Sequence, residues 1–491
     1  MTSTTLRERA LKILPPELCF IDGRYTAGSG AEERFVHPGD GTEFATRKLA
    51  SPSDVDHAVA AARQAQTGWW RQEPGRRRDI LHSIAGAVRA HADELAALVT
   101  LEMGMPIKAS TAGVHQAAEW FSYYAGHADK LAGTVPTVGA PGRMLTYTEH
   151  TPHGVVGAII PWNGPVIALA LKVAPALAAG NAVVLKPSEI APFAALRFAE
   201  LAHEAGLPPG VLEVIAAAKD GGEALTRHPD VSMLTFTGGN VAGAAVAAAA
   251  AQRQIPAVLE LGGKSASLVF DDVDIRRTAK ISLLLGAVQN SGQGCFLPTR
   301  VLVQDNIFEP FVEHLAAAAE RTRIGDPFDP EVSMGPVVSH QARNRIEGVV
   351  ARALGDGAVL LGGGGLPGSL HEVPGSFLAP TVLRASPDSS IAQEEVFGPV
   401  LTVIPFADEE EAVTIANSTR YGLAGYVWTR DVARAHRVAS RLEAGNVSVN
   451  GMAGLPPNAE FVGWHASGPG REGGESGFYD FLRTKVIHVQ L

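Results

Sequence analysis

The pattern of apolar and polar positions divides the chain into a helical first quarter and a later region in which strands and helices alternate. Residues 53–132 hold Ala-rich stretches whose apolar positions have helical spacing. From residue 154 onward, short β-branched apolar runs appear, the first two at residues 154–160 and 182–186. Segments with helical spacing follow them, at residues 166–178 and 191–205. Such alternation predicts a parallel sheet with right-handed crossovers.

A second alternating block begins at residues 265–270 and continues past Val400. The chain has 491 residues, whereas a single hydrophobic core stops growing at about 250–300 residues. We therefore predict an α/β fold with two Rossmann-like parallel-sheet lobes. The peripheral, β-rich residues 144–149 and 485–491 predict a small additional β-flap.

Composition and charge exclude several classes of partner. The net charge is −10, and no long basic run is present, so we expect no nucleic-acid partner. Cys19 and Cys295 are the only cysteines, too few for a disulfide framework. The N-terminal stretch lacks the apolar core of a secretory signal, and residues 154–185 are interrupted by prolines and polar residues. We expect a cytoplasmic protein with no membrane partner.

One glycine motif resembles a cofactor fingerprint but does not predict one. Gly363, Gly365 and Gly368 satisfy G-x-G-x-x-G, yet Pro367 and Pro374 prevent the helix that must follow. We therefore interpret this stretch as a surface turn. No H-E-x-x-H motif or paired-cysteine spacing occurs, so no metal site is predicted.

Polar residues follow the first two predicted strands of the parallel sheet. Asn163 lies at the carboxyl end of the first strand, where parallel sheets bind ligands, and its amide could donate to an oxyanion. An asparagine in a Pro-bounded turn is the simpler interpretation of this position alone. Lys186 closes the second strand and must reach solvent, an anion or a hydroxyl, and Glu189 is predicted to open the next helix.

Two further segments carry a candidate base and a candidate nucleophile. Glu260 interrupts the apolar stretch AVLELGG, so burial is expected to raise its pKa, as a general base requires. It could equally be a helix cap or an ion-pair partner. Cys295 lies in a Gly-rich loop, where glycines allow close approach to the sulfur and free the Cys295 N–H as an oxyanion donor. A buried, inert cysteine is the alternative.

Together, and in this order, the motifs resemble the aldehyde dehydrogenase superfamily. The resemblance extends from about residue 20 to 490. The motifs are P-W-N at residues 161–163, K-P-S-E at 186–189, E-L-G-G-K at 260–264, G-Q-x-C at 292–295 and E-E-x-F-G-P at 394–399.

The resemblance implies a mechanism of aldehyde oxidation. The Cys295 thiolate attacks the aldehyde, and the oxyanion of the resulting thiohemiacetal rests on Asn163 and the Cys295 N–H. Hydride then passes to a nicotinamide cofactor. Glu260 activates the water that hydrolyses the thioester.

The resemblance also implies how the cofactor binds. Lys186 and Glu189 would bind the adenine ribose. The carboxylate of Glu189 should repel a 2′-phosphate, which favours NAD, although NADP is possible. The other implied contacts are Glu395 on the nicotinamide ribose, Phe397 against the ring, Trp162 along the channel and Gly239 below the pyrophosphate.

The family's domain plan carries over as an expectation. It implies an NAD-binding domain in residues 1–133 and 151–261 and a catalytic domain in residues 262–466. The β-flap, residues 134–150 and 467–491, would cap exposed strand edges in a homodimer or homotetramer.

Two positions bear on the substrate. Relatives often have aromatic residues where this chain has Gly164 and Leu171. We therefore expect a wide, apolar tunnel and a bulky apolar or aromatic aldehyde. Betaine aldehyde is an alternative, because aromatic cages that bind cations cannot be located from sequence. Two rival functions are acyl transfer to coenzyme A, whose enzymes tend to lack the equivalent of Glu260, and a binding protein that has lost its chemistry.

Overall fold

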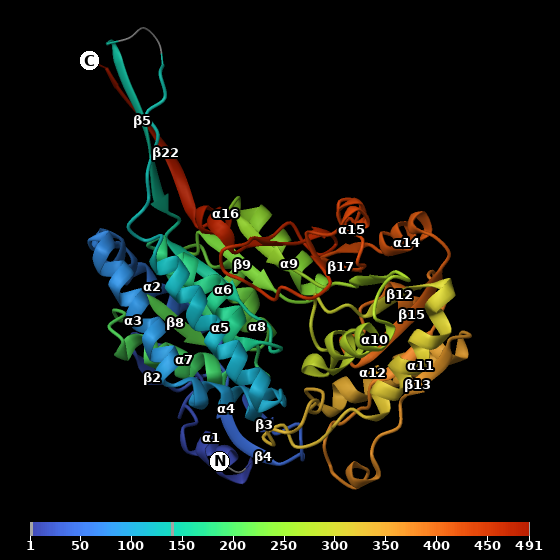
Figure 1. Ribbon diagram of the computed structural model, residues 1–491. Coiled ribbons are helices and arrows are strands. Elements are labelled where there is room, and N and C mark those ends of the chain that lie inside the picture. Colours follow the sequence, from blue (N-terminus) through green and yellow to red (C-terminus); the bar gives the residue numbers. More distant parts are fainter. Residues whose placement is uncertain (1–2, 139–141, 491) are drawn as a thin grey trace.

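The computed structural model describes residues 3–138 and 142–490. Residues 1–2, 139–141 and 491, which the predicted domain and flap boundaries include, lie outside the described residues. The chain forms two lobes, each built on a seven-stranded, mostly parallel sheet (Figure 1). The predicted α/β class with two parallel-sheet lobes is confirmed. The predicted boundaries between functional domains stay a prediction.

The sheet of the first lobe has the strand order β10-β9-β6-β7-β8-β1-β2. Strands β6 to β10 are parallel, and the short β1 and β2 add an antiparallel edge. The strands are β1 (Cys19–Ile21), β2 (Arg24–Thr26), β6 (Val155–Ile159), β7 (Ala182–Lys186), β8 (Leu212–Ile215), β9 (Met233–Thr237) and β10 (Ala257–Glu260).

Helices cover both faces of this sheet (Figure 1). The long α2 begins with a capping box, in which Ser51 accepts a hydrogen bond from the Asp54 N–H and Asp54 accepts one from Ser51. The helices are α1 (Ser3–Lys12), α2 (Pro52–Arg71), α3 (Pro74–Ala90), α4 (Ala92–Met103), α5 (Ile107–Ala125), α6 (Pro165–Ala178), α7 (Phe193–Glu204), α8 (Lys219–Arg227) and α9 (Asn240–Arg253).

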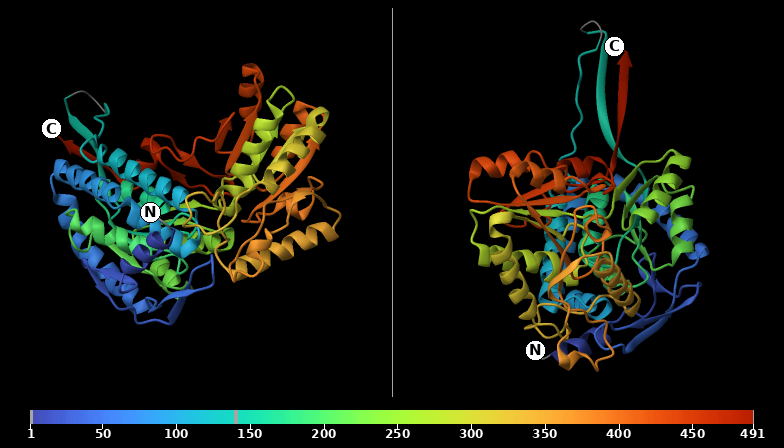
Figure 2. Two further views of the ribbon diagram at one scale, coloured as in Figure 1. Left: turned by 60° about the horizontal axis from the view of Figure 1, so that its bottom comes forward. Right: turned by 90° about the vertical axis from the view of Figure 1, so that its right-hand side faces the viewer.

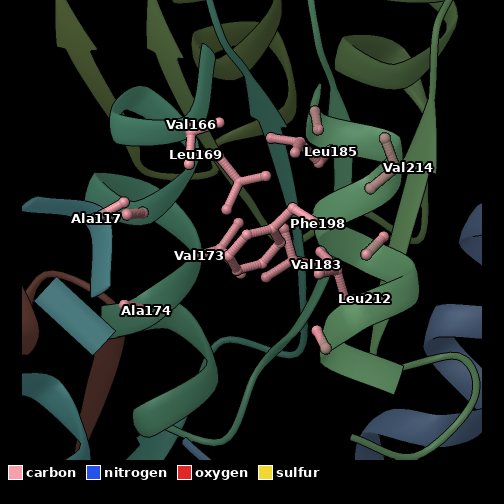
Figure 3. Close-up of a cluster of buried hydrophobic side chains, with 14 of the residues drawn as sticks. Ala117, Val166, Leu169, Val173, Ala174, Val183, Leu185, Phe198, Leu212 and Val214 are labelled. Atoms are coloured by element: carbon pink, nitrogen blue, oxygen red, sulfur yellow. The ribbon is translucent and has the colours of Figure 1, made fainter. Parts of the chain in front are cut away.

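The core of the first lobe forms where α6 and α7 pack on the central strand β7. Figure 3 shows Phe198 of α7 between Leu169 and Val173 of α6 and Val183 and Leu185 of β7. All five side chains are buried. Because β7 is covered on both faces, its residues 182–185 are all apolar instead of alternating.

The predicted start of the helix after β7 is wrong, and this changes the position of the candidate residue Glu189. Glu189 was expected to open the helix after β7, but it lies in a turn, and α7 begins only at Phe193. Pro192 explains the difference, because a residue that precedes a proline is disfavoured in the α conformation. Glu189 is therefore placed by the turn instead of by a helix.

The second lobe repeats the plan with the order β13-β14-β15-β12-β11-β17-β18, in which only β13 is antiparallel to its neighbour. Its strands are β11 (Ala266–Val269), β12 (Arg300–Gln304), β13 (Val359–Gly363), β14 (Thr381–Arg384), β15 (Val400–Phe406), β17 (Ala424–Trp428) and β18 (Asn446–Val449). Its helices are α10 (Ile275–Leu283), η1 (Leu284–Val288), η2 (Gln289–Gly292), η3 (Asp305–Ile307), α11 (Phe308–Glu320), α12 (His340–Gly355), η4 (Gly368–Leu370), α13 (Ser390–Gln393), α14 (Glu409–Ala416) and α15 (Val432–Ala439).

The glycine motif after β13 is followed by the short 3-10 helix η4 and not by an α-helix, as its prolines predict. Smaller elements complete the chain. They are β3 (Glu32–Val36), β4 (Glu43–Lys48), β16 (Tyr421–Gly422), β19 (Phe461–Val462), β20 (Trp464–His465), β21 (Arg471–Glu472) and α16 (Gly474–Tyr479).

A two-stranded antiparallel ladder projects from the first lobe (Figures 1 and 2). It pairs β5 (Met144–Pro152) with β22 (Leu482–Gln490) along their full lengths. Several apolar side chains on it are exposed, among them Leu145 and Val486. The predicted strands are confirmed, and their role in oligomer formation stays a prediction. Within the described residues, no helix combines the length and the apolar character that crossing a bilayer requires.

Substitution of one buried and one exposed valine tests how strongly the stability of the protein depends on the core of the first lobe. Val183 is fully buried, whereas Val432 is 70% exposed. We expect Val183→Ala to lower the free energy of unfolding by about 2 kcal/mol, because two methyl groups leave the core and a cavity remains. The matched change Val432→Ala should shift it by less than about 0.5 kcal/mol. Urea unfolding measures both variants, and equal midpoints would contradict the assigned core.

Candidate active site

A cavity of about 1060 Å³ lies where the carboxyl ends of β6, β7 and β9 face loops of the second lobe. The topology explains this position, because parallel strands present their carboxyl ends at one sheet edge. The structure brings together almost all of the predicted site residues here. Those lining the cavity are Trp162, Asn163, Lys186, Glu189, Gly239, Cys295, Glu395 and Phe397. Glu260 lies at the end of the neighbouring strand β10.

Cys295 follows a loop with an unusual backbone. Asn290 and Ser291 both have left-handed conformations, with φ of 48° and 53°. Gly292 also has a positive φ, and a side chain there would collide with the carbonyl of Gly398. Non-glycine residues in this region carry strain and persist only where surrounding contacts hold them. Ser291 is held by a hydrogen bond of 2.8 Å to the Gly335 carbonyl.

Asn163 is tied directly to this loop. Its Nδ2 donates to the carbonyl of Gln293, at 3.1 Å. Asn290 strengthens the link, because its Nδ2 donates to the carbonyls of both Asn163 and Gln293. The amide of Asn163 is therefore oriented two residues before Cys295. An amide nitrogen has two hydrogens, so one is left to donate elsewhere.

The surroundings of Cys295 disfavour its charged form. Burial raises the pKa of the thiol, and the carboxylates of Glu395 and Glu260 raise it further. Two groups act in the opposite direction. The backbone N–H groups of Cys295 and Phe296 are close to the sulfur and lower the pKa of the thiol. These N–H groups are the local donors that could stabilise a thiolate.

Glu260 is the least satisfied acidic group of the site. Its side chain is 2% exposed, and neither carboxylate oxygen has a hydrogen-bond partner among the described residues. Burial raises its pKa well above the ordinary value, and the carboxylate of Glu472 raises it further. Lys172 lowers it. Gly470 passes so close that a Cβ there would lie 2.5 Å from Glu260 Oε1. The predicted rise in the pKa of Glu260 is present.

The charged pair beside Glu260 was not predicted from the sequence. Lys172 Nζ lies 2.6 Å from Glu472 Oε1 and donates to Thr235 Oγ1 at 3.0 Å. Both charged side chains are buried. In the sequence, only the lysine within the apolar helix α6 indicates such a pair, because a buried lysine requires a partner. Its partner is three hundred positions away, and nothing local identifies it.

Glu395 and Phe397 project from the second lobe. Glu395 Oε1 accepts from the Gly263 N–H at 3.1 Å, and burial raises the pKa of this carboxyl. A Cβ at Gly262 would lie 2.6 Å from Glu395 Oε2, which accounts for the Gly-Gly bend. The ring of Phe397 stands edge-on to Trp162, with centroids 5.5 Å apart. The two lobes thus share one aromatic wall.

The opposite end of the cavity suits a ribose and a pyrophosphate. Lys186 Nζ lies 3.4 Å from Glu189 Oε2, so an ammonium and a carboxylate are available to hydroxyl groups. Gly239 precedes the first turn of α9, and no described atom lies within 4 Å of the position that a Cβ would occupy there. The N–H groups of a helix N-terminus attract phosphate oxygens. These residues fit a dinucleotide.

The remaining candidate positions concern the substrate. Gly164 precedes α6, and Leu171 is a buried residue of that helix. Phe296 and Phe461 form an edge-on pair with centroids 6.0 Å apart. Phe296 directly follows Cys295, so this aromatic pair lies beside the nucleophile loop.

Comparison with known proteins gives a consistent family. Residues 25–487 match the sequence profile of the Aldehyde dehydrogenase family. The chain is 39% identical to the 3,6-anhydro-alpha-L-galactose dehydrogenase of Streptomyces coelicolor, over 96% of each chain. It is also 39% identical to the betaine aldehyde dehydrogenase of Rhizobium etli, over 98% of each chain.

Solved structures agree. An indole-3-acetaldehyde dehydrogenase in complex with NAD+ is similar, with a TM-score of 0.95, 36% identity and full coverage of both chains. The betaine aldehyde dehydrogenase of Staphylococcus aureus in complex with NAD+ also has a TM-score of 0.95, with 34% identity over 99% of this chain and 97% of that one.

The charge of Glu395 should restrain the reactivity of Cys295. Because that charge raises the pKa of the thiol, we expect Glu395→Gln to speed alkylation by iodoacetamide at pH 8, by up to roughly tenfold. Glu394→Gln is the control, since the adjacent carboxylate is not among the groups that shift this thiol. Cys19 does not compete, because its side chain is fully buried, whereas Cys295 is partly exposed. Equal rates in both variants would contradict the electrostatic account.

Proposed function

The chain belongs to the aldehyde dehydrogenase family, and on that premise we propose that it oxidises a bulky apolar or aromatic aldehyde to the carboxylic acid, using NAD. The observation that carries the proposal is the hydrogen bond from Asn163 to Gln293, which ties the amide to the loop that carries Cys295. A thiol, two backbone donors and an oriented amide converge on one cavity that also holds a dinucleotide-sized groove.

The first chemical step forms a bond between Cys295 Sγ and the aldehyde carbon. The carbonyl oxygen takes up negative charge, and we assign its stabilisation to the free Nδ2 hydrogen of Asn163 and to the Cys295 N–H. Asn163 can do this while its other hydrogen stays on Gln293. When bound, NAD supplies the acceptor for the hydride of the substrate carbon.

The second step is hydrolysis of the thioester. We assign the role of general base to Glu260, which takes a proton from the attacking water. The water oxygen bonds to the acyl carbon, the C–S bond breaks and Cys295 leaves as thiolate. A carboxyl whose pKa is raised by burial is a stronger base than an exposed one once it is ionised.

Cofactor contacts are assigned from the two ends of the cavity. We assign the adenine ribose to Lys186 and Glu189, and the nicotinamide ribose to Glu395. Trp162 and Phe397 would flank the nicotinamide, and Gly239 would let the pyrophosphate approach the N-terminus of α9. A carboxylate at Glu189 disfavours the extra phosphate of NADP, so NADP is the second choice.

Our proposal for the substrate class rests on two positions that lack an aromatic side chain. Gly164 directly follows Asn163 and Leu171 lies on α6, and neither position carries an aromatic side chain. A quaternary ammonium such as betaine aldehyde binds best over aromatic faces, and positions 164 and 171 supply none; betaine aldehyde, for which two of the relatives are named, is therefore our second choice. The similar indole-3-acetaldehyde dehydrogenase is named for a bulky aromatic aldehyde.

We also propose roles for the two lobes and for the β5–β22 ladder. The first lobe would bind the cofactor and the second would carry the nucleophile. The β5–β22 ladder would pair with a second copy of the chain, because it offers exposed backbone and apolar side chains. The charge and composition suit the cytoplasm.

The test of the reaction is NADH formation, followed by absorbance, with NAD and a panel of aliphatic, aromatic and cationic aldehydes. We expect turnover that Cys295→Ala abolishes, while Cys19→Ala retains it. Signal that survives the loss of Cys295, or none with any aldehyde, would favour a non-catalytic protein. Product that appears only with coenzyme A would favour acyl transfer.

The same panel tests the substrate class. We expect kcat/KM to be higher for a hydrophobic aromatic aldehyde than for acetaldehyde. Leu171→Phe should reduce activity on the aromatic aldehyde more than on acetaldehyde, because a ring at this position would narrow the proposed tunnel. A preference for acetaldehyde or betaine aldehyde in the unaltered enzyme would overturn the substrate assignment alone.

The pH dependence tests Glu260 as the base. Glu260 must lose its proton to act, so activity should rise with pH through its pKa. Glu472 raises that pKa, so Glu472→Gln should move the acid limb of kcat to lower pH. Lys172 lowers it, so Lys172→Met should move the limb to higher pH. Shifts in the same direction would contradict the assignment.

A further inference from the structure

Tyr426 lies behind the nucleophile and is used by none of the steps above. It belongs to β17, where Tyr426 pairs with Ser267 of β11 and Ser448 of β18. The residue is 2% exposed. Its hydroxyl donates to the carbonyl of Phe296, at 2.7 Å.

This hydrogen bond joins a rigid strand to the residue that follows the nucleophile. Phe296 has contacts on both sides of its backbone. Its carbonyl accepts a hydrogen bond from Tyr426, and its N–H is one of the groups that lower the pKa of the adjacent Cys295 thiol. The N–H and the carbonyl of Phe296 belong to two peptide planes that are connected by its φ and ψ bonds. A hydrogen bond that holds the carbonyl restricts rotation about these bonds and so restricts the direction of the N–H.

We propose that Tyr426 is a positioning residue, whose hydroxyl holds the Phe296 carbonyl so that the Phe296 N–H stays directed at the Cys295 sulfur. The inference rests on the proposed function, in which Cys295 is the nucleophile. Tyr426 does not contact substrate in this role. It acts through the peptide backbone.

The loop needs such an external support. The residues before Cys295 include two left-handed non-glycine residues and Gly292, so the upstream side is strained. Downstream, Phe296 and Leu297 belong to no helix or strand. Asn163 holds the loop upstream through Gln293, and Tyr426 holds it downstream. The sulfur lies between the two supports.

Tyr426 is suited to a role as a permanent donor. Burial raises the pKa of its hydroxyl, and the nearby Cys295 raises it further. The hydroxyl therefore keeps its proton near neutral pH, where the enzyme is tested. A phenolate at this position would instead repel both the thiolate and the carbonyl oxygen.

Loss of the hydroxyl should be visible in the ionisation of Cys295. Without the hydrogen bond, the Phe296 N–H is free to turn away, and the thiolate loses one of its two backbone donors. We expect Tyr426→Phe to slow iodoacetamide alkylation of Cys295 near pH 7.5 by roughly two- to tenfold, which corresponds to the net contribution of one hydrogen bond to the stability of the thiolate. At high pH the rates should converge, because both proteins are then ionised.

Tyr124→Phe is the matched control. Its hydroxyl is buried and donates to a backbone carbonyl, that of Gly474, at 3.0 Å. This variant loses the same type of hydrogen bond away from the nucleophile loop, and its alkylation profile should match that of the unaltered protein. Thermal melting and NAD affinity, measured on both variants, establish that each is folded.

Three outcomes decide the proposal. A profile shifted to higher pH in Tyr426→Phe alone, with NAD affinity unchanged, supports it. Identical profiles for Tyr426→Phe and the unaltered protein overturn it. Equal slowing in both tyrosine variants also overturns it, because general loosening would then explain the effect. Alkylation needs no aldehyde, so these outcomes are independent of whether NADH formation is observed.

Discussion

The site depends on one conflict: its reactive groups must be buried to exclude water, and burial disfavours the charges that they need. Cys295, Glu260 and Glu395 all have raised pKa values, with burial as the main cause in each. Their negative charges would also repel one another within one cavity. The surrounding structure is best understood as a set of fixed donors and nearby cations, among them the buried Lys172 beside Glu260, that make these charges tolerable.

Backbone geometry supplies most of that compensation. The N–H groups of Cys295 and Phe296 lower the pKa of the thiol, and the Gly263 N–H donates a hydrogen bond to Glu395. Such donors are available only where the chain bends out of regular structure, because strands and helices use their N–H groups internally. The strained loop before Cys295 and the Gly-Gly bend after Glu260 are therefore the cost of exposing donors to the site.

Local sequence pattern was enough to predict the strands and the sheet edge at which the site forms. Apolar runs located β6, β7 and β11, and the carboxyl ends of the parallel strands predicted where Asn163 and Lys186 would lie. The placement of Glu189 was wrong because Pro192 delays the helix. Neither the Lys172–Glu472 pair nor the contact of Tyr426 with Phe296 could be found locally. Each joins residues more than a hundred positions apart, and only the packing of the sheets brings them together.

The two carboxylates of the site show why residue type alone does not determine role. Glu395 accepts a hydrogen bond from Gly263 and faces nearby cations, so its charge is partly neutralised and it is suited to bind hydroxyl groups. Glu260 has no hydrogen-bond partner in the described part of the chain, and the acidic Glu472 is close by. A carboxylate without partners keeps its affinity for a proton. Binding therefore suits the satisfied group and proton transfer suits the unsatisfied one, although both are glutamates at the edge of the same cavity.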